Sequence, residues 1–300
     1  MRRTAVAVVV AAALFSASMI SRPKEPAASA AAASPHLLFN GGFETGSYKP
    51  WSMPQCANYG NPINNATRAF GNFNLVSDIV GEGAYAARFD VPADPTHLTR
   101  CQVITKRPVN AGGDDYYSLM FYLPKGWTTG ITPPQYGVII AQLNYQGLGP
   151  GSPNISLIAF PDHVTLVMLT GITTTTGRPA YQYQSNADIT SRYVNLPKLY
   201  AVPPGMQLGV WHELIIHAHW ATDSSGKIDA WHRIKGRRAW QKTASLRGYP
   251  TLEENPDGSY PPTTIDMTGA YRMRSAAPTS VWLDGFSRSG SFAAGAAHLP

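Results

Sequence analysis

The sequence predicts an all-β sandwich, and three observations support this prediction. From Leu37 onward, short runs in which apolar and polar residues alternate are separated by turn-forming residues. No window shows a sustained helical period. Charged residues make up only 14% of the chain, against about 25% in an average protein, while Gly, Pro, Thr and Tyr are frequent. This composition is typical of extracellular β proteins.

Each predicted strand places alternate side chains on one face and ends near a turn-forming residue. Two hairpins are expected, one turning at Pro161-Asp162 and one at 223–226. Long loops are expected at 171–200 and 245–264, and loops of this kind often form a binding cleft. The predicted strands are 117–123, 139–145, 155–160, 163–169, 211–220, 228–234 and 280–286, with Tyr117, Leu119, Phe121 and Leu123 sharing one face and Ile139, Ala141, Leu143 and Tyr145 another.

The first 30 residues predict a signal peptide. Arg2 and Arg3 precede an apolar run from Thr4 to Ile20, and Ala28-Ser29-Ala30 resembles a cleavage site. A retained N-terminal helix is the alternative, but the run is short for a membrane span of about 20 residues. We therefore expect residues 1–30 to be the signal, 31–36 a flexible leader and 37–300 a single domain. The mature protein is expected to be secreted, extracellular and not bound to a membrane.

The charge of the chain limits the classes of binding partner that can be expected. The net charge of +6 falls to about +3 without the leader, and no dense Lys/Arg block is present. Nucleic acid is therefore not expected as a partner, whereas a polyanionic substrate is compatible with the mild positive charge.

Cys56 and Cys101 are the only cysteines. In an exported chain they predict one disulfide, with two free buried thiols as the alternative.

Several familiar catalytic motifs are absent. The sequence contains no G-x-S-x-G, no Walker loop and no dinucleotide fingerprint. Trp211–His217 differs from the zinc-protease motif because its histidines are five residues apart on a strand-like run. His217 and His219 form an H-x-H pair that could bind a metal, but no clear third ligand accompanies them. We expect no metal and no cofactor.

Polar side chains gather on one face of several predicted strands. Such a mixture of amides, guanidinium groups, imidazoles and an aromatic ring suits sugars, which need planar hydrogen-bonding groups and an aromatic surface. An ordinary solvated face, or Trp231 as plain core packing, is the alternative. If these faces line one sheet, they form a polysaccharide-binding groove. The faces are Gln142, Asn144 and Gln146; Arg100 and Gln102; Glu213, His217 and His219; and Asp229, Trp231 and Arg233.

A series of short motifs resembles the heparin-lyase-I-like polysaccharide lyases, which include glucuronan-lyase-like members. The resemblance spans nearly the whole mature chain and rests on the order and spacing of its motifs. It implies a β-jelly-roll sandwich (concanavalin A-like) with a concave substrate groove, in which uronic-acid polymers are cleaved by β-elimination. The motifs are Asn40–Gly46, Arg100-x-Gln102, Tyr122-Leu123-Pro124, Ala141–Asn144, Gly209-x-Trp211-His212 with Ile216-His217, Gly226-x-Ile228–Trp231 and Gly269–Arg272.

The resemblance also implies roles for individual residues. Tyr271 matches the tyrosine that acts as the acid and is a candidate for the base as well, while Gln142 and Arg100 match groups that hold the uronate carboxylate. Asn144 stands where related lyases carry histidine, and Met267 where they often carry lysine. The base is therefore expected to be Tyr271 itself, or His217 or His219. The candidate catalytic residues are Tyr271, Asn144, Gln142, Arg100 and His217; the candidate substrate-binding residues are Gln102, Gln146, His219, Trp231 and Arg272.

The leading functional hypothesis is a monomeric, secreted polysaccharide lyase acting on an acidic polysaccharide. Two alternatives remain at this point. One is a non-catalytic carbohydrate-binding protein of the same fold, suggested by the missing histidine and lysine. The other is a glycoside hydrolase, which needs a pair of carboxylates across the cleft; Glu213 and Asp229 are its candidates.

Overall fold

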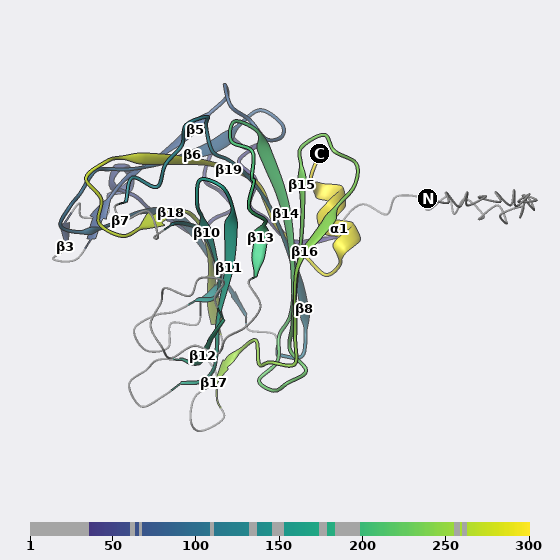
Figure 1. Cartoon of the computed structure of the whole chain (residues 1–300). Coiled ribbons are helices and arrows are strands. Elements are labelled where there is room, and N and C mark those ends of the chain that lie inside the picture. Colours follow the sequence, from purple (N-terminus) through teal and green to yellow (C-terminus); the bar gives the residue numbers. More distant parts are fainter. Residues whose placement is uncertain are drawn as a thin grey trace, which may run out of the picture. The chain divides into compact units, whose positions relative to one another are not determined.

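The computed structural model describes residues 36–60, 64–65, 68–108, 111–131, 137–145, 153–173, 179–183, 199–254, 259 and 263–300. Within these residues nearly all regular structure is β-strand, arranged in two sheets (Figure 1). A short 3-10 helix, η1 (Ala57–Tyr59), and one α-helix, α1 (Phe292–His298), complete the described elements. No helix in this part of the chain is long and apolar enough to cross a membrane.

The first sheet, here called sheet A, contains eight strands within the described residues. All of its strand pairs are antiparallel. In spatial order they are β16 (Gln241–Arg247), β15 (Lys227–Ile234), β14 (Trp211–His219), β8 (Asp114–Tyr122), β19 (Thr279–Ser289), β6 (Ala86–Val91) and β5 (Asn72–Val76), with β1 (Leu37–Asn40) also paired to β19.

The second sheet, sheet B, contains eleven strands within the described residues and is antiparallel except at β4–β7 and β11–β17. Its order is β12 (Pro179–Tyr183), β11 (Val164–Thr173), β10 (Pro153–Ala159), β9 (Val138–Tyr145), β18 (Thr263–Arg272), β7 (Leu98–Pro108), β4 (Arg68–Phe70) and β3 (Asn64–Asn65); β13 (Tyr200–Val202) and β17 (Glu253–Glu254) pair with β11, and β2 (Met53–Gln55) with β7.

The main hydrophobic core lies between the two sheets. It is formed by the apolar face of each sheet, for example Leu119 and Ile216 from sheet A and Val103 and Leu157 from sheet B. The predicted face of Tyr117, Leu119, Phe121 and Leu123 is confirmed, because all four side chains are buried in this core. Burial of two facing apolar surfaces is what stabilises such a sandwich. The fold is therefore the expected β-jelly-roll sandwich.

A second, smaller apolar cluster lies on the other face of sheet A, beneath α1. Ile215 and Met120 point to this side, and Trp231, Trp240 and Phe292 pack against the cluster. The sequence did not predict this helix, which begins after Ser291, whose side chain accepts a hydrogen bond from the Ala294 amide. In Figure 1, α1 lies beside β14, β15 and β16 on the side away from sheet B. This face of sheet A is therefore partly covered.

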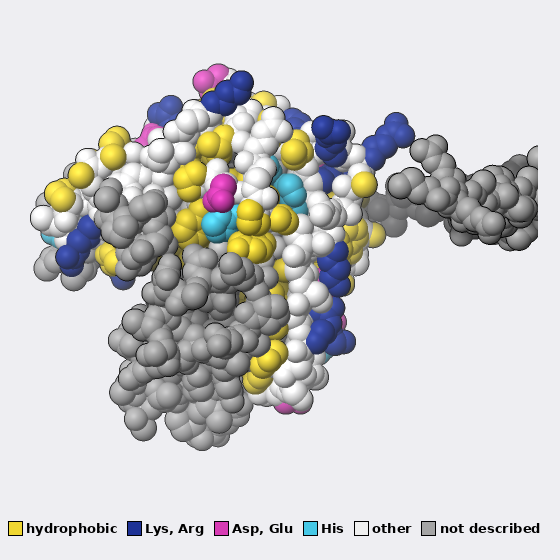
Figure 2. Space-filling view, viewed as in Figure 1, with side chains coloured by type: hydrophobic (Ala, Val, Ile, Leu, Met, Phe, Trp, Pro, Cys, Tyr) yellow, Lys and Arg dark blue, Asp and Glu magenta, His cyan; other side chains and the backbone are white. Residues whose placement is uncertain are grey.

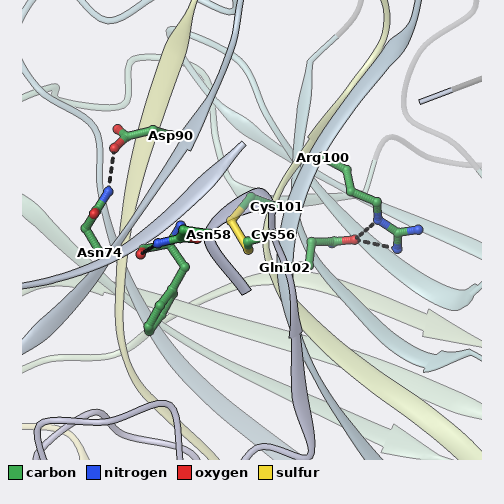
Figure 3. The surroundings of a disulfide bond; sticks show 8 residues. Cys56, Asn58, Asn74, Asp90, Arg100, Cys101 and Gln102 are labelled. Carbon is green, nitrogen blue, oxygen red and sulfur yellow. Dashed lines mark hydrogen bonds between the residues drawn. A yellow bond between two sulfur atoms is a disulfide. The ribbon is translucent and has the colours of Figure 1, made fainter. Parts of the chain in front are cut away.

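The disulfide expected from the sequence is confirmed. Cys56 and Cys101 are bonded and fully buried. Cys101 lies on β7 between Arg100 and Gln102, and its side chain points into the core while theirs point to the opposite face (Figure 3). The bond thus attaches the segment before η1 to a central strand of sheet B.

The predicted loops at 171–200 and 245–264 contain more regular structure than expected. β11 continues to Thr173, β12 follows at Pro179–Tyr183, and β16 continues to Arg247. These segments are short or lie near the edges of the sheets, where alternation is a weak signal.

Candidate active site

The candidate site is formed by three adjacent strands in the middle of sheet B: β7, β18 and β9. Arg100 is the register partner of Tyr271, and Gln102 is the partner of Gly269. Met267, on the same face of β18, is the partner of Gln142 on β9. Because opposite residues of paired strands share a face, these side chains all lie on the outer face of sheet B, away from the core. Four residues predicted from the sequence, Arg100, Gln102, Gln142 and Tyr271, are thus brought to one surface.

Arg100 is at the centre of this group. Its Nη2 and Nε donate to Oε1 of Gln102 over 2.8 and 3.2 Å (Figure 3). The same Nη2 lies 3.4 Å from Sδ of Met267, and the guanidinium carbon is 5.3 Å from the centre of the Tyr271 ring. The guanidinium therefore extends from the Tyr271 ring to Met267, whose register partner on β9 is Gln142.

Two amide atoms in this group have no hydrogen-bond partner within the described structure: Nε2 of Gln102 and Oε1 of Gln142. Both side chains are nearly or fully buried, with 0% of Gln102 and 6% of Gln142 exposed. A buried polar atom without a partner costs about 1–3 kcal/mol. Such atoms beside a guanidinium are suited to a polar ligand that supplies an acceptor to one amide and a donor to the other.

Gly269 lies on β18 between Met267 and Tyr271, where the backbone of β7 approaches closely. Its φ of +145° is unfavourable for other residues, and an added Cβ would lie 2.3 Å from the Cys101 carbonyl oxygen. Sequence reasoning noted this glycine only as part of a motif; its backbone angle cannot be read from a single sequence. The missing side chain allows β7 and β18 to lie close together beside Tyr271.

Asn144 does not belong to this surface, which corrects its assignment to the catalytic group. It lies at a bulge between β9 and β18 with φ +56°, and it is fully buried. Its Oδ1 accepts from Nη2 of Arg107 at 3.0 Å, and its Nδ2 donates to Oδ1 of Asn154 at 2.7 Å. Its backbone N–H donates to Oδ1 of Asp266 over 2.8 Å. The bulge breaks the alternation from which Asn144 was placed beside Gln142.

The same strand departs from alternation once more. Ile140, rather than Ile139, is buried in the core together with Ala141 and Leu143, because the register shifts near this point against both neighbouring strands. Gln142 still reaches the outer face. Gln146 lies outside the described residues.

Arg272 also lies away from this surface, which corrects its placement among the substrate-binding residues. It is only 2% exposed, although its neighbour Tyr271 is half-buried on the outer face. Its Nη1 donates to the Thr129 carbonyl at 2.6 Å and its Nε to Oγ1 of Thr99 at 3.1 Å. Burial lowers the pKa of Arg272 to about 10, so it remains charged at neutral pH. Arg272 thus connects the end of β18 to the segments that contain Thr129 and Pro92.

His217, His219 and Trp231 lie on the other sheet, which corrects their placement in the same groove. They belong to β14 and β15 of sheet A and point away from the core. A proton transfer between His217 and a sugar bound at Tyr271 is therefore excluded by topology. Glu213 and Asp229, the candidate pair for a glycoside hydrolase, lie on the same face of sheet A.

His217 is held by two carboxylates. Its Nε2 lies 2.7 Å from Oδ1 of Asp114 and its Nδ1 lies 3.5 Å from Oδ2 of Asp229, while its ring stacks on Tyr116 at 4.4 Å. Burial lowers its pKa, but hydrogen bonds to Asp229 and Asp114 outweigh burial and raise the pKa overall. Asp229 also pairs with Lys242 at 2.7 Å and with Arg247. These contacts make the cluster an ion-pair network.

No group of three or more His, Cys, Asp or Glu side chains suited to a metal was found in the part of the chain that the structure describes. The absence of a metal or cofactor therefore stays a prediction. The arrangement on sheet B supplies a cation, two amides and a phenol. Together these groups can bind an anionic sugar and move a proton.

Comparison with known protein families gives one match. The sequence profile of a family described as "Polysaccharide lyase" matches residues 43–287. A search of curated proteins found no match.

Two solved structures are similar to this chain. The endo-β-1,4-glucuronan lyase of the fungus Trichoderma reesei is similar with a TM-score of 0.58 and 15% identity, covering 86% of this chain and 97% of that one. A marine PL-14 alginate lyase from Aplysia kurodai matches with a TM-score of 0.48 and 11% identity, covering 82% and 92%. At this identity the first similarity shows a shared fold.

Proposed function

The chain belongs to the polysaccharide lyase family, and on that premise we propose that it cleaves a uronic-acid-containing polysaccharide by β-elimination at Tyr271. The observation that carries the proposal is the position of Arg100. Its guanidinium lies over the Tyr271 ring and contacts the buried amide of Gln102 and the sulfur of Met267, the register partner of Gln142. The glucuronan lyase of similar fold acts, by its name, on a uronate polymer, which is consistent with this substrate class.

The first requirement of β-elimination is to neutralise the carboxylate of the uronate. The proton on C5 becomes acidic only when the negative charge that develops on removing it is stabilised. Arg100 is the cation that contacts Gln102, Met267 and the Tyr271 ring, and Nε2 of Gln102 is a donor without a partner. We assign both to the carboxylate. Gln142 offers Oε1 as an acceptor, which suits a sugar hydroxyl.

The second requirement is proton transfer. A base removes the C5 proton, the C5–H electrons form the C4–C5 double bond, and the C4–oxygen bond breaks. An acid then protonates the departing oxygen. Asn144 lies in the interior and His217 on the other sheet, whereas the titratable side chain of Tyr271 packs against Arg100. We propose that Tyr271 serves as both base and acid.

The predicted export signal and the disulfide support action outside the cell. Disulfides persist mainly in oxidising compartments, and the bonded Cys56–Cys101 pair fits this setting. We propose that the protein is secreted. Action as a monomer and absence of nucleic-acid binding stay predictions.

The test is to incubate the protein with a panel of uronans and follow absorbance from the new C4–C5 double bond. The Tyr271→Phe variant should lose at least about 100-fold in kcat, while binding of the polymer is retained. Tyr116→Phe is the matched control, since Tyr116 is a half-buried tyrosine on the outer face of sheet A. Full activity of Tyr271→Phe would refute the assignment of Tyr271. Binding without product from the unaltered protein would instead favour a non-catalytic carbohydrate-binding role.

A further inference from the structure

The positive charge of the chain is concentrated in one hairpin. Residues 227–247, which form β15, β16 and the turn between them, contain seven Lys or Arg residues and one acidic residue. Their net charge of +6 equals that of the whole 300-residue chain. All other residues taken together are therefore neutral on balance, and a polyanion is attracted to this hairpin more than to the rest of the protein.

Most of these basic side chains are accessible. Lys235, Arg237 and Arg238 are exposed in the turn, and within the described structure they form no ion pair. At the other end of the hairpin, Lys227 and Arg247 are exposed register partners. Figure 2 shows Lys and Arg side chains along the margin of the molecule where Figure 1 places β15 and β16. The eight residues of β15 separate the two ends by roughly 25 Å at about 3.3 Å per residue.

Two tryptophans lie within the same strip. Nζ of Lys242 is 5.5 Å from the centre of the Trp231 ring, and the guanidinium of Arg233 is 4.4 Å from that of Trp240. Both rings are partly exposed and pack against Phe292 of α1, which fixes their positions. Fixed aromatic faces beside cations suit a chain that has both apolar C–H surfaces and carboxylates. A phosphate polymer would need only the cations.

We propose that the outer surface of the β15–β16 hairpin is a second binding site for acidic polysaccharide, separate from the catalytic face of sheet B. This proposal rests on the proposed function for the class of ligand, but not on the catalytic role of Tyr271. The length of the strip matches several sugar residues rather than one. The hairpin surface holds one segment of the polysaccharide. A second segment of the same molecule, or a neighbouring polysaccharide molecule, occupies the face around Arg100.

Such a site changes how the enzyme treats long and short substrates. A polymer held at one site is present at the other at a raised effective concentration. A short oligosaccharide cannot span both sites and gains nothing. The hairpin should therefore lower the KM for polymer and leave the turnover of short oligosaccharides unchanged.

The test compares two double variants with the same change of charge. Arg237→Gln/Arg238→Gln alters the hairpin, and Lys49→Gln/Lys125→Gln alters exposed lysines outside it. Affinity is measured for polyglucuronate, polymannuronate, neutral dextran and single-stranded DNA at two salt concentrations, in the full mature protein carrying Tyr271→Phe so that polymer is not degraded. Rates on polymer and on a short uronate oligosaccharide are measured with Tyr271 intact.

We expect the hairpin variant to lose about tenfold in affinity for the uronate polymers and to weaken the salt dependence of binding. Its rate on the short oligosaccharide should equal that of the unaltered protein, and the control variant should bind polymer normally. Equal losses in both variants, or unchanged polymer binding in the hairpin variant, would overturn the proposal. So would binding of DNA as tight as that of the uronates, which would show nonspecific attraction. Failure of the lyase assay with hairpin-dependent binding retained would refute only the catalytic proposal.

Discussion

Arg100 and Arg272 lie on neighbouring strands of sheet B and have opposite surroundings. Arg100 is on the outer face among Gln102, Met267 and Tyr271. Arg272 points inward, and carbonyl groups of surrounding loops accept its hydrogen bonds. The direction of each side chain, more than its chemistry, therefore distinguishes the arginine proposed to bind substrate from the one expected to stabilise the fold.

This difference can be measured with a pair of substitutions. Arg272→Gln should lower the free energy of unfolding by about 2–4 kcal/mol, because buried carbonyl groups lose their donors. Arg100→Gln should lower kcat/KM by about 100-fold or more on a uronan, with little loss of stability. Urea unfolding and the double-bond assay give both values. A stable Arg272→Gln variant with impaired kcat/KM would show that Arg272 contacts substrate after all.

The sequence alone was sufficient for some residues of the site and not for others. Arg100 and Gln102 share one face, as predicted, because β7 alternates regularly through these positions, and Tyr271, which was proposed from the family resemblance, is the register partner of Arg100. Asn144 was placed wrongly because a single bulge reverses the direction of its side chain. A bulge depends on the register of two neighbouring strands, and that information is distributed over the fold rather than carried by adjacent residues.

At the scale of single elements, the two faces of β14 have different surroundings. One face packs in the hydrophobic core, and the other, here called the ion-pair face, carries His217, whose carboxylate partners lie on the neighbouring strands. His217 is on the ion-pair face, between Asp114 and Asp229. Because its folded-state pKa is raised, its contribution to stability is full below the unfolded pKa of about 6.5. The contribution is lost as the pH rises through the folded pKa.

The His217→Gln variant should therefore lower Tm most near pH 6 and progressively less toward pH 8.5. In this range Asp114 and Asp229 stay ionised, since the pKa of each is lowered, Asp229 by its hydrogen bonds from His217, Arg247 and Lys242 in spite of burial. His219→Gln is the control, because His219 contacts only Asp114 of this pair and its side chain is more exposed. Thermal unfolding at each pH measures the effect. A loss of Tm that does not vary with pH would indicate lost packing on Tyr116 instead.

Strands were predicted better than their assignment to sheets. The hairpins around Pro161-Asp162 and 223–226 are confirmed as β10–β11 and β14–β15. Local alternation identifies these strands but does not tell which sheet each one joins. For this reason β14 and β15 were expected to line a groove with β9, although the two groups lie in different sheets.

At the scale of the whole molecule, one buried arginine connects the two sheets. Arg107 of β7 is 3.1 Å from Asp115 of β8 and 3.1 Å from Asp266 of β18, and it donates to Asn144. These carboxylates are almost fully buried. Neither sequence spacing nor a motif indicated this network, because its members lie far apart in the chain.

Removal of this arginine would leave two buried carboxylates without their cation. Arg107→Leu should therefore cost about 3–5 kcal/mol of unfolding free energy, measured by urea unfolding. Arg88→Leu is the control, since its ion pair with Asp90 is at the surface and such pairs contribute at most about 1 kcal/mol. Comparable losses in both variants would argue against a role of Arg107 in joining the sheets.

The position of Cys101 between Arg100 and Gln102 has a practical consequence for producing the protein. Material made in a reducing cytoplasm would lack the link between β7 and the segment before η1. Arg100 and Gln102, which are proposed to bind the carboxylate, would then lie on a strand that has lost one covalent link to the rest of the fold. Preparations purified without oxidative folding should thus show poor specific activity, and that activity should recover after air oxidation.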